Sequence, residues 1–446
     1  MDGHAERAGF GGRAPALAPA PAGEADPRRT PVAPASFGPA RRGRVEEDPM
    51  DTRDGTARAF DVVLFGATGF VGELTARYLA AHAPAGCRWA LAGRDRGRLE
   101  RLRDSLAAGH PECAGLPLLV ADAGDADALR DLAESARVVA TTVGPYVRYG
   151  GPLVAACARA GTDYVDLTGE PEFVDLVYLR HDARARETGA RLVHACGFDS
   201  VPHDLGVYFT VRHLPRDVPL RVDGFVRADA LFSGGTLASA LTALSRVRQT
   251  ARAARERRLR EPRPAGRRVG AAPGRPRFSR EAGAWALPLP TLDPRIVARS
   301  AAALPLYGPD FRYRHHAAVR TWPVALGGAA AVGAGFALAQ FPPARRWLSE
   351  RWAPGSGPDA ERRRRSWFRV RFVGEGGGRR VRAEVSGGDP GYGETAKMLA
   401  ESALCLAFDE GLPATAGQVT TAVAMGDALL GRLRAAGLRF RLTDVR

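Results

Sequence analysis

Lysine is almost absent from this chain. Lys397 is the only lysine among 64 basic residues, so arginine carries nearly all of the positive charge. A catalytic pair made of a tyrosine and a lysine four residues later is therefore excluded. Alanine, glycine and proline are abundant, which is typical of a GC-rich coding sequence. Part of the basicity is therefore expected to carry no function.

Cysteine is also scarce and lacks any metal-binding spacing. The five cysteines are scattered and never form a C-x-x-C pair, which indicates reduced, mostly buried thiols in a cytosolic compartment. His315 and His316 are the only adjacent histidines, and neighbours on a strand point to opposite faces. The sequence therefore predicts no metal site.

Residues 1–50 lack a long apolar run, so no signal segment is expected there. Residues 1–58 are rich in proline, alanine, glycine and arginine without periodicity, which predicts a disordered tail. Met50 lies just before the first predicted strand and is an alternative start of translation. We expect a cytoplasmic protein associated with the plasma membrane.

The formal net charge is +15, which indicates acidic partners. Phosphate-bearing cofactors, anionic lipid headgroups and an acidic acyl carrier protein all fit this charge. Nucleic acid is not expected, because the chain has no zinc-finger spacing, no RNP-like motif and no interleaving of basic and aromatic residues.

The most informative stretch is FDVVLFGATGFVG, residues 60–72. A short apolar run typical of a buried parallel strand ends in a glycine turn, and an amphipathic helix follows. Gly66 allows a tight turn, Gly69 lets a pyrophosphate approach the main chain, and Gly72 lets the helix pack closely. The free N–H groups of the helix then face the phosphates. An ordinary glycine-rich turn is the alternative.

The second predicted strand ends in Gly93-Arg94, about twenty residues after the glycine turn. A site specific for NAD usually carries an acid at this place, whereas a guanidinium can bind a 2′-phosphate. The sequence therefore favours NADP(H) over NAD. Asp95 is a reservation, since it could turn towards the ribose, and Arg94 could also be a solvated surface residue.

Strands and helices alternate from Phe60 to about Leu205, which predicts a Rossmann-type doubly wound parallel sheet. Ligands of such sheets lie at the carboxyl ends of the strands. The predicted helices of this part cover residues 96–108, 125–135, 151–160 and 172–188. The predicted cofactor-binding residues are Gly66, Ala67, Thr68, Gly69, Phe70, Val71, Gly72, Arg94, Asp122, Val143, Gly144 and Pro145.

Three residues on the strand-end loops are the predicted catalytic residues: Tyr146, Asp199 and His203. Tyr146 could donate a hydrogen bond or be a packed aromatic. Asp199 and His203 could move a proton or cap the next helix, and for Asp199 and Ser200 capping is the commoner role. Asp166 and Glu170 could order their loop by hydrogen bonds alone.

The second half of the sequence predicts an α+β domain with a mixed or antiparallel sheet. Strands are expected at 220–229, 311–320, 367–374 and 380–385, with a helix at 237–250. The arginine-rich stretch 251–280 is predicted to be a mobile surface linker rather than a folded element. The predicted organisation is a tail (1–58), a NADP-binding domain (59–214), an α+β substrate and oligomerisation domain (215–391) and C-terminal helices that pack back on the core (392–446).

One segment is unusually long and apolar for a soluble protein. Residues 321–344 carry no charge before the arginines that follow, and a helix over 322–341 would be about 30 Å long. Trp322 and Trp347 near its ends suit an interface. We expect a buried or interfacial helix, with a membrane span and a re-entrant hairpin as the alternatives.

Several long motifs, taken together, resemble one family. VLFGATGFVG, LAGR, TTVGPY, YVDLTGE, ACGFDSVPHDLG and GDPGYGETAKMLAESAL, in this order, are similar to saccharopine dehydrogenase-like oxidoreductases. Within that family the chain resembles the trans-acting enoyl reductases of actinobacterial lipid biosynthesis, whose eukaryotic relatives are membrane-associated. The resemblance covers about Phe60 to Leu442. It implies a NADP-binding Rossmann domain, a second α+β domain and a role in lipid metabolism.

Three functions stay open. The first is an NADP-dependent enoyl or related reductase acting on a lipidic or carrier-bound acyl chain. The second is a saccharopine-type amino-acid oxidoreductase, and the third is a membrane-associated cofactor-binding scaffold without turnover. The expected partners are an acyl substrate, an acyl carrier or polyketide synthase, a membrane surface and a second copy of this chain.

Overall fold

The computed structural model describes residues 58–229, 245–272, 274–289, 291–341 and 358–446. The predicted tail, except for its last residue, and most of the helix predicted at 237–250 lie outside these ranges. So does the end of the uncharged segment, residues 342–344.

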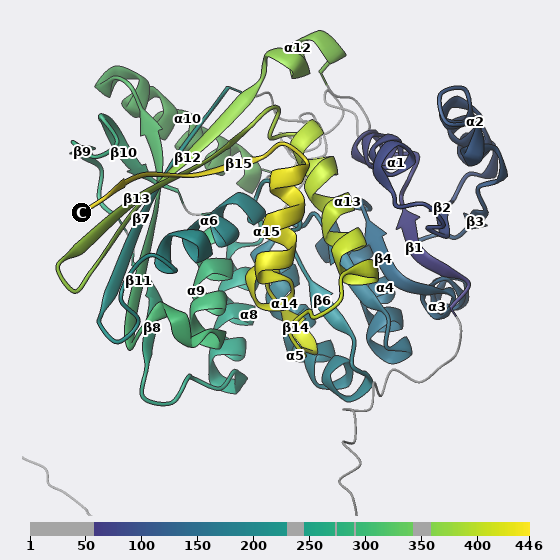
Figure 1. The fold of residues 1–446 in the computed structure, drawn as a ribbon, viewed down its shortest axis with the longest axis horizontal. Helices are drawn as coiled ribbons and strands as arrows, with labels where there is room; N and C mark the ends of the chain where they lie inside the picture. The colour runs from purple at the N-terminus through teal and green to yellow at the C-terminus, as the bar shows by residue number, and fades with distance from the viewer. Residues whose placement is uncertain (1–57, 230–244, 273, 290, 342–357) are drawn as a thin grey trace, which may run out of the picture. The chain divides into compact units, whose positions relative to one another are not determined.

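A parallel sheet of seven strands forms the first half of the fold (Figure 1), in the order β14-β6-β5-β4-β1-β2-β3. Its inner strand β1 is buried on both faces, because Val62 and Leu64 point into one hydrophobic core and Val63 and Phe65 into the other. The doubly wound sheet predicted from the sequence is confirmed. Its strands are β1 (Phe60–Phe65), β2 (Trp89–Gly93), β3 (Leu118–Val120), β4 (Ala136–Thr141), β5 (Asp163–Asp166), β6 (Arg191–Val193) and β14 (Gly417–Val419).

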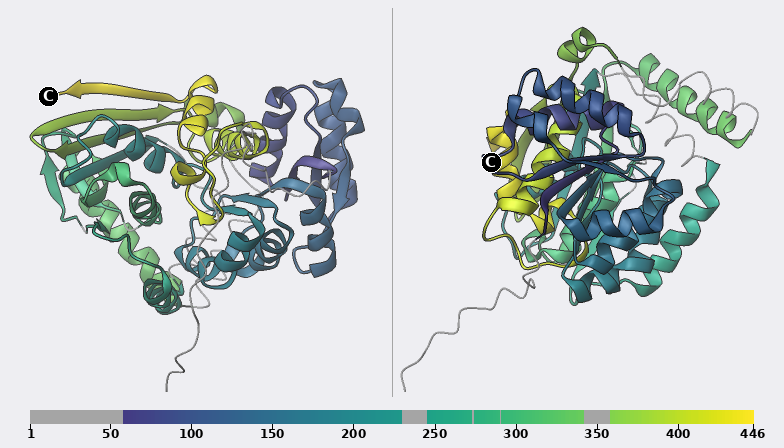
Figure 2. Two further views of the ribbon diagram at one scale, coloured as in Figure 1. Left: turned by 60° about the horizontal axis from the view of Figure 1, so that its bottom comes forward. Right: turned by 90° about the vertical axis from the view of Figure 1, so that its right-hand side faces the viewer.

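Helices cover both faces of this sheet, as the right-hand view of Figure 2 shows. One core contains side chains from α1, α2 and α13, and the other contains side chains from α3, α4 and α5. These helices are α1 (Phe70–His82), α2 (Arg96–Ala107), α3 (Ala126–Ser135), α4 (Tyr146–Ala160), α5 (Pro171–Thr188) and α13 (Gly393–Phe408), with a 3₁₀ helix η1 (Pro111–Gly115) after α2.

A second, mixed sheet has eight strands, in the order β15-β13-β12-β7-β11-β10-β9, with β8 paired to β11. The strand pair predicted at 367–374 and 380–385 is confirmed as antiparallel β12 and β13, whereas β7 and β11 run parallel. The strands are β7 (Leu220–Asp229), β8 (Arg268–Ala271), β9 (Arg277–Ser279), β10 (Ala284–Pro288), β11 (Asp310–Val319), β12 (Trp367–Gly376), β13 (Arg379–Gly387) and β15 (Arg439–Val445).

Helix α6 (Val201–Val211) joins the two sheets. It follows β6 of the parallel sheet and packs on β12, where Gly206 permits the close approach: a Cβ there would lie 2.3 Å from the Phe372 ring. The remaining helices are α8 (Val247–Arg260), α9 (Asp293–Ala303), α10 (Trp322–Gln340), α12 (Ala360–Arg365), α14 (Thr421–Ala424) and α15 (Gly426–Ala435), with a 3₁₀ helix η2 (Pro305–Tyr307) after α9.

The prediction of a mobile linker at 251–280 is wrong. This stretch contains most of α8 and the whole of β8 and β9. Arg257 is only 3% exposed, because its guanidinium pairs with Glu261 at 2.6 Å and lies over the Tyr178 ring. A dense arginine run is therefore folded here, since Glu261 at the end of α8 pairs with the charge and Tyr178 of α5 covers it.

The predicted start of the fourth helix is also wrong. Helix α4 begins at Tyr146 instead of residue 151 and continues through Gly150 and Pro152. Gly150 is required by packing, because a Cβ there would lie 2.7 Å from the Phe173 ring of α5. Gly150, just before the predicted helix start, is therefore a contact point between two helices.

Helix α10 exposes apolar side chains among its described residues: Leu326 is 58% exposed and Val324 and Leu338 are exposed as well. Its first residue Trp322 contacts Trp285 of β10, with ring centroids 4.9 Å apart. The interior position that the sequence left open is therefore excluded for these described side chains. No helix in the described ranges is both long and apolar enough to cross a membrane.

Four of the five cysteines are buried and none forms a disulfide. The prediction of reduced, mostly buried thiols is confirmed, with Cys87 partly exposed. Burial raises the pKa of the buried Cys157, Cys196 and Cys405 thiols. These thiols are therefore protonated and serve as small apolar residues.

Candidate active site

The glycine turn has the geometry expected from its sequence. Gly66 has a φ of +85°, and a Cβ there would lie 2.7 Å from Val143 Cγ2. A Cβ on Gly72 would lie 2.1 Å from the Gly66 carbonyl oxygen, so the helix could not pack against the turn. Gly69 differs, because its φ is ordinary and a Cβ would meet only the Gly66 oxygen, at 3.3 Å. Space is therefore left beside Gly69.

Helix α1 begins without a side-chain cap. Its N-cap residue is Gly69, which has no side chain to accept from the first N–H groups. Four N–H groups at a helix start need partners, and the positive end of the helix dipole attracts an anion. The uncapped helix start and the space at Gly69 fit the pyrophosphate of a dinucleotide.

A cavity of about 250 Å³ lies next to this turn. Thr68 and Glu73 line it from the turn and α1, and Arg98, Arg101 and Ser105 line it from α2. Sequence reasoning missed both arginines, although they follow Arg94 at helical spacing and thereby carry a signal. The predicted Arg94 directly follows β2 and is exposed, and it does not line this cavity.

Asp95 has a local role in the structure. Its Oδ1 accepts a hydrogen bond of 2.9 Å from the Arg98 N–H and so caps α2, which engages one of its two carboxylate oxygens. The guanidinium groups of this region are suited to a 2′-phosphate.

The predicted cofactor-binding residues that follow β3 and β4 differ in whether they reach the glycine turn. Thr142 donates to the Gly66 carbonyl, and Val143 lies against Gly66. Gly144 and Pro145 lead directly into α4. Asp122 accepts from Gly124 N in a tight turn after β3. The structure brings Val143 to the glycine turn, whereas the contacts of Asp122 are local.

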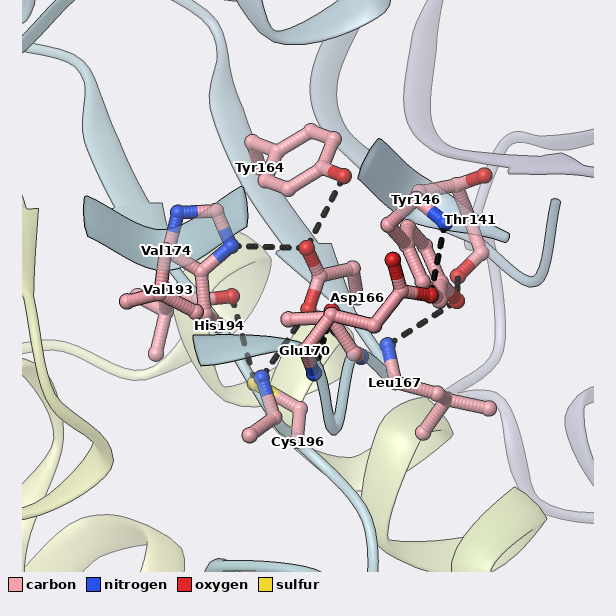
Figure 3. A network of polar contacts seen from close by, with 12 residues as sticks. Thr141, Tyr146, Tyr164, Asp166, Leu167, Glu170, Val174, Val193, His194 and Cys196 are labelled. Carbon is pink, nitrogen blue, oxygen red and sulfur yellow. Dashed lines mark hydrogen bonds and ion pairs between the residues drawn. The ribbon is translucent and has the colours of Figure 1, made fainter. Parts of the chain in front are cut away.

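Asp166 is the centre of the polar network in Figure 3. Its carboxylate is fully buried and accepts from Tyr164, from the N–H groups of Thr168 and Ala195, and lies 2.7 Å from His194 Nδ1. These contacts join the ends of β5 and β6. Asp166 therefore orders the loops by hydrogen bonds, which was one of the two roles expected for it.

Glu170 caps α4 from the next loop of the sheet. Its two carboxylate oxygens accept from the N–H groups of Tyr146 and Val147, each at 2.9 Å. Tyr146 is buried, and its hydroxyl donates to the Thr141 carbonyl and accepts from Leu167 N. Both hydroxyl functions are thus engaged by the main chain, which favours a positioning role for Tyr146.

Asp199 is exposed as a residue, but its carboxylate lies close to Gly169. Neighbouring protein atoms desolvate this carboxyl group and, together with the charge of Asp293, raise its pKa to about 6, while His203 lowers it. The predicted capping role is not seen, because the N-cap Ser200 makes no side-chain cap hydrogen bond. A carboxyl group that is protonated near pH 6 can donate a proton.

His203, on the first turn of α6, is buried beside two residues of the second sheet region. Its Nδ1 lies 2.9 Å from Asp293 Oδ1 at the start of α9, and His315 Nε2 of β11 lies 3.6 Å from Asp293 Oδ2. Asp293 and His315 were missed, because no sequence pattern links residues that only the tertiary fold brings together. Burial lowers the pKa of His315 to about 3, so its imidazole is neutral.

Comparison with known proteins places these features in context. The profile of the saccharopine dehydrogenase NADP-binding domain matches residues 62–193. A Mycobacterium tuberculosis protein, whose name assigns it provisionally to the trans-acting enoyl reductases, is 42% identical over 424 residues and covers 87% of this chain and 98% of its own length. A trans-acting enoyl reductase of Mycobacterium ulcerans is 38% identical over 411 residues, covering 85% of this chain and 97% of its own.

A solved structure has the same fold. The saccharopine dehydrogenase (L-Glu forming) of Saccharomyces cerevisiae superimposes with a TM-score of 0.51 and covers 86% of this chain and all of that chain. The two sequences are only 13% identical, so the likeness concerns the fold alone.

Proposed function

Because the chain belongs to the saccharopine dehydrogenase-like family, and within it matches the trans-acting enoyl reductases over most of its length, we propose that it reduces the double bond of an enoyl substrate with NADPH. The substrate is an acyl chain held in a lipid or on a carrier such as a polyketide synthase. The similarity over nearly the full length of the named reductases is the observation that carries this proposal.

The cofactor part of the proposal is supported by the residues around the glycine turn. Gly69 and the uncapped start of α1 would hold the pyrophosphate, and Arg94 and Arg98 would hold the 2′-phosphate. The dinucleotide would supply the hydride when bound. The protein must then exclude water and deliver a proton to the carbon next to the carbonyl.

Asp199 is the proton donor that the geometry favours. The residue is exposed, whereas His203 is 2% exposed and the Tyr146 hydroxyl is engaged by main-chain groups. The loop that carries Asp199 follows β6, and in open parallel sheets the ligand lies outside the carboxyl ends of the strands. Asp166 holds this loop and thereby positions the acid.

The rival function is a saccharopine-type amino-acid oxidoreductase. A dicarboxylate substrate requires paired cationic side chains near the reacting carbon. The strand-end loops 142–145, 167–170 and 194–200 contain no arginine or lysine. Their composition therefore favours an acyl chain over a dicarboxylic amino acid.

The test is turnover by purified protein. NADPH consumption should be observed with a crotonyl-type thioester and not with a mixture of an oxoacid and an amino acid. The opposite result would establish the rival function. Turnover of neither, with normal NADPH binding, would support a cofactor-binding scaffold.

We also propose that α10 lies on a membrane surface. Helix α10 exposes apolar side chains, and the ring of its Trp322 lies against that of Trp285 in a tilted arrangement. The exposed Phe278 of β9 contacts Trp285 edge to face. Monomeric soluble proteins rarely expose such contiguous apolar surface, and arginines near an anionic membrane add about 1 kcal/mol each. A second copy of the chain is the competing occupant.

Flotation with anionic lipid vesicles tests this placement. The protein should float with the vesicles, and the double variant Val324→Ser, Leu326→Ser should not. A protein that stays unbound and whose dimer is broken by the same variant would assign this face to a second copy.

A further inference from the structure

Three buried side chains from three separate elements converge at the junction of the two sheets. His203 comes from α6, Asp293 from α9 and His315 from β11, and each is at most 5% exposed. One ligand atom of each lies within 4.8 Å of the others. The cluster is outside the glycine turn and the cavity beside it.

The contacts within this cluster leave a buried polar atom unsatisfied. His203 Nδ1 lies 2.9 Å from Asp293 Oδ1 and interacts with it, whereas His203 Nε2 has no hydrogen-bond partner among the described residues. The distance from His315 Nε2 to Asp293 Oδ2 is 3.6 Å, which is too long for a hydrogen bond. A His–Asp–His proton relay would need both bonds.

Buried polar atoms without partners are costly, so such a group points to a missing partner. The ligand atoms of the three side chains lie within 4.8 Å of one another, which is close enough for a single ion to contact all of them. His203 Nε2 has no hydrogen-bond partner among the described residues and lies in the protein interior. A cation at this point would pair with Asp293 and with the lone pairs of both imidazoles.

The opposite side of His315 is already arranged for metal binding. Its Nδ1 lies 2.9 Å from the Tyr313 hydroxyl oxygen, which can accept a hydrogen bond from Nδ1–H. In that tautomer the lone pair of Nε2 is free for a metal ion. Metal-binding histidines commonly use their second nitrogen in this way. Gly224 on β7 makes room for the tyrosine, since a Cβ there would lie 2.4 Å from the Tyr313 hydroxyl oxygen.

We propose that His203, Asp293 and His315 bind one divalent zinc ion. Two imidazoles and one carboxylate are a donor set of zinc, whereas magnesium and calcium prefer oxygen ligands only. Water would complete the tetrahedron. The ion would connect α6, which follows the parallel sheet, to α9 and β11 of the second region. Its test is independent of the proposed reaction, because zinc binding is measured without substrate.

The sequence predicted no metal site, since the three ligands are far apart in the chain and none belongs to a short motif. His315 and His316 illustrate the point. His316 does face away from this group and stacks on Phe225, so the expectation that the two histidines diverge was correct. The conclusion that neither binds a metal did not follow.

Metal content and spectroscopy test the site. Tag-free protein, stripped with a chelator and re-dialysed against limiting zinc chloride, should hold one zinc per chain by elemental analysis. Cobalt(II) should replace zinc and give the intense visible bands of a tetrahedral site. Absence of stoichiometric metal in folded protein would overturn the proposal. The cluster would then be a buried contact between Asp293 and the two histidines.

Variants locate the ion. His203→Ala should lose the cobalt bands, and Tyr313→Phe should weaken zinc binding by about 10–100-fold while keeping all three ligands. His316→Ala is the matched control, because it removes the neighbouring buried histidine on the other face of β11, and it should keep the bands. If His203→Ala does not fold, Tyr313→Phe decides: unchanged affinity in that variant contradicts the site.

Discussion

The proposed 2′-phosphate site depends on Arg94 and Arg98, which should therefore set the preference for NADPH over NADH. Arg94→Ala or Arg98→Ala should weaken NADPH binding by about 1–3 kcal/mol, typical of a lost charged hydrogen bond, and barely change NADH binding. Fluorescence titration with both cofactors measures this. Arg130→Ala, at an exposed position on α3, is the control. Equal losses for NADPH and NADH would defeat the assignment.

Gly69 leaves space for a ligand, whereas Gly72 is required by the packing of α1 against the glycine turn. Gly69→Val should abolish NADPH binding and leave thermal unfolding nearly unchanged, because its Cβ would meet only one backbone oxygen. Gly72→Ala should instead lower the melting temperature, because its Cβ would overlap the Gly66 carbonyl. Normal NADPH binding by folded Gly69→Val would show that phosphates are held elsewhere.

Asp199 gives a pH dependence of known sign. A carboxyl group whose pKa is raised to about 6 is protonated below pH 6 and can donate there, so kcat/KM should fall as the pH rises through about 6. Asp293 and His203 are the titratable groups that act on its pKa. Asp199→Asn should reduce activity and remove this dependence.

The profile is best measured on chelator-treated protein, so that a bound cation does not shift the carboxyl group. A kcat/KM that stays constant from pH 5.5 to 8 in the chelator-treated wild-type protein would contradict the role of Asp199. A dependence that persists unchanged in Asp199→Asn would do so as well.

At the scale of single elements, the start of α4 shows what local sequence cannot reveal. Glu170 supplies the cap for α4 from beyond the next strand, β5. Glu170→Gln leaves one buried N–H without a good acceptor and should lower the free energy of unfolding by about 1–3 kcal/mol. Glu187→Gln, on the exposed face of α5, should change it by less than about 0.5 kcal/mol. Denaturant titration compares the two.

Elements with a strong local pattern were predictable. The strand at 220–229 has the predicted bounds, and the glycine turn has the predicted conformation, because apolar alternation and backbone freedom act locally. The folded arginine segment and the start of α4 were not, since Arg257 and Glu170 find their partners on other elements. In the site, Arg98 had a readable signal, whereas Asp293 and His315 had none.

At the scale of the whole described fold, the C-terminal region belongs to both sheets. It was predicted to consist of helices packed on the core, and α13 and α15 do pack there. It also contributes β14, which pairs with β6 of the parallel sheet, and β15, which pairs with β13 of the mixed sheet. The two halves of the fold are therefore completed by the same final stretch.

Removal of that stretch should affect both halves together. A chain ended after Val419 keeps β14 and loses β15, and it also loses Leu429 and Leu433 of α15 from the core. Limited proteolysis should then cut both sheet regions, and NADPH binding should be lost although the glycine turn is intact. A protease-resistant NADPH-binding fragment from this variant would show that the parallel sheet folds alone.

The order of synthesis gives this arrangement a consequence in the cell. A ribosome makes β1 first, and the strands that complete either sheet emerge only after most of the chain is outside the exit tunnel. Until then, the edges of β6 and β13 are unpaired templates for other strands, which is a known aggregation hazard. The nascent chain should therefore depend on a chaperone until residue 445 is released, and stalled or prematurely terminated copies should be degraded rather than accumulate as half-active reductase.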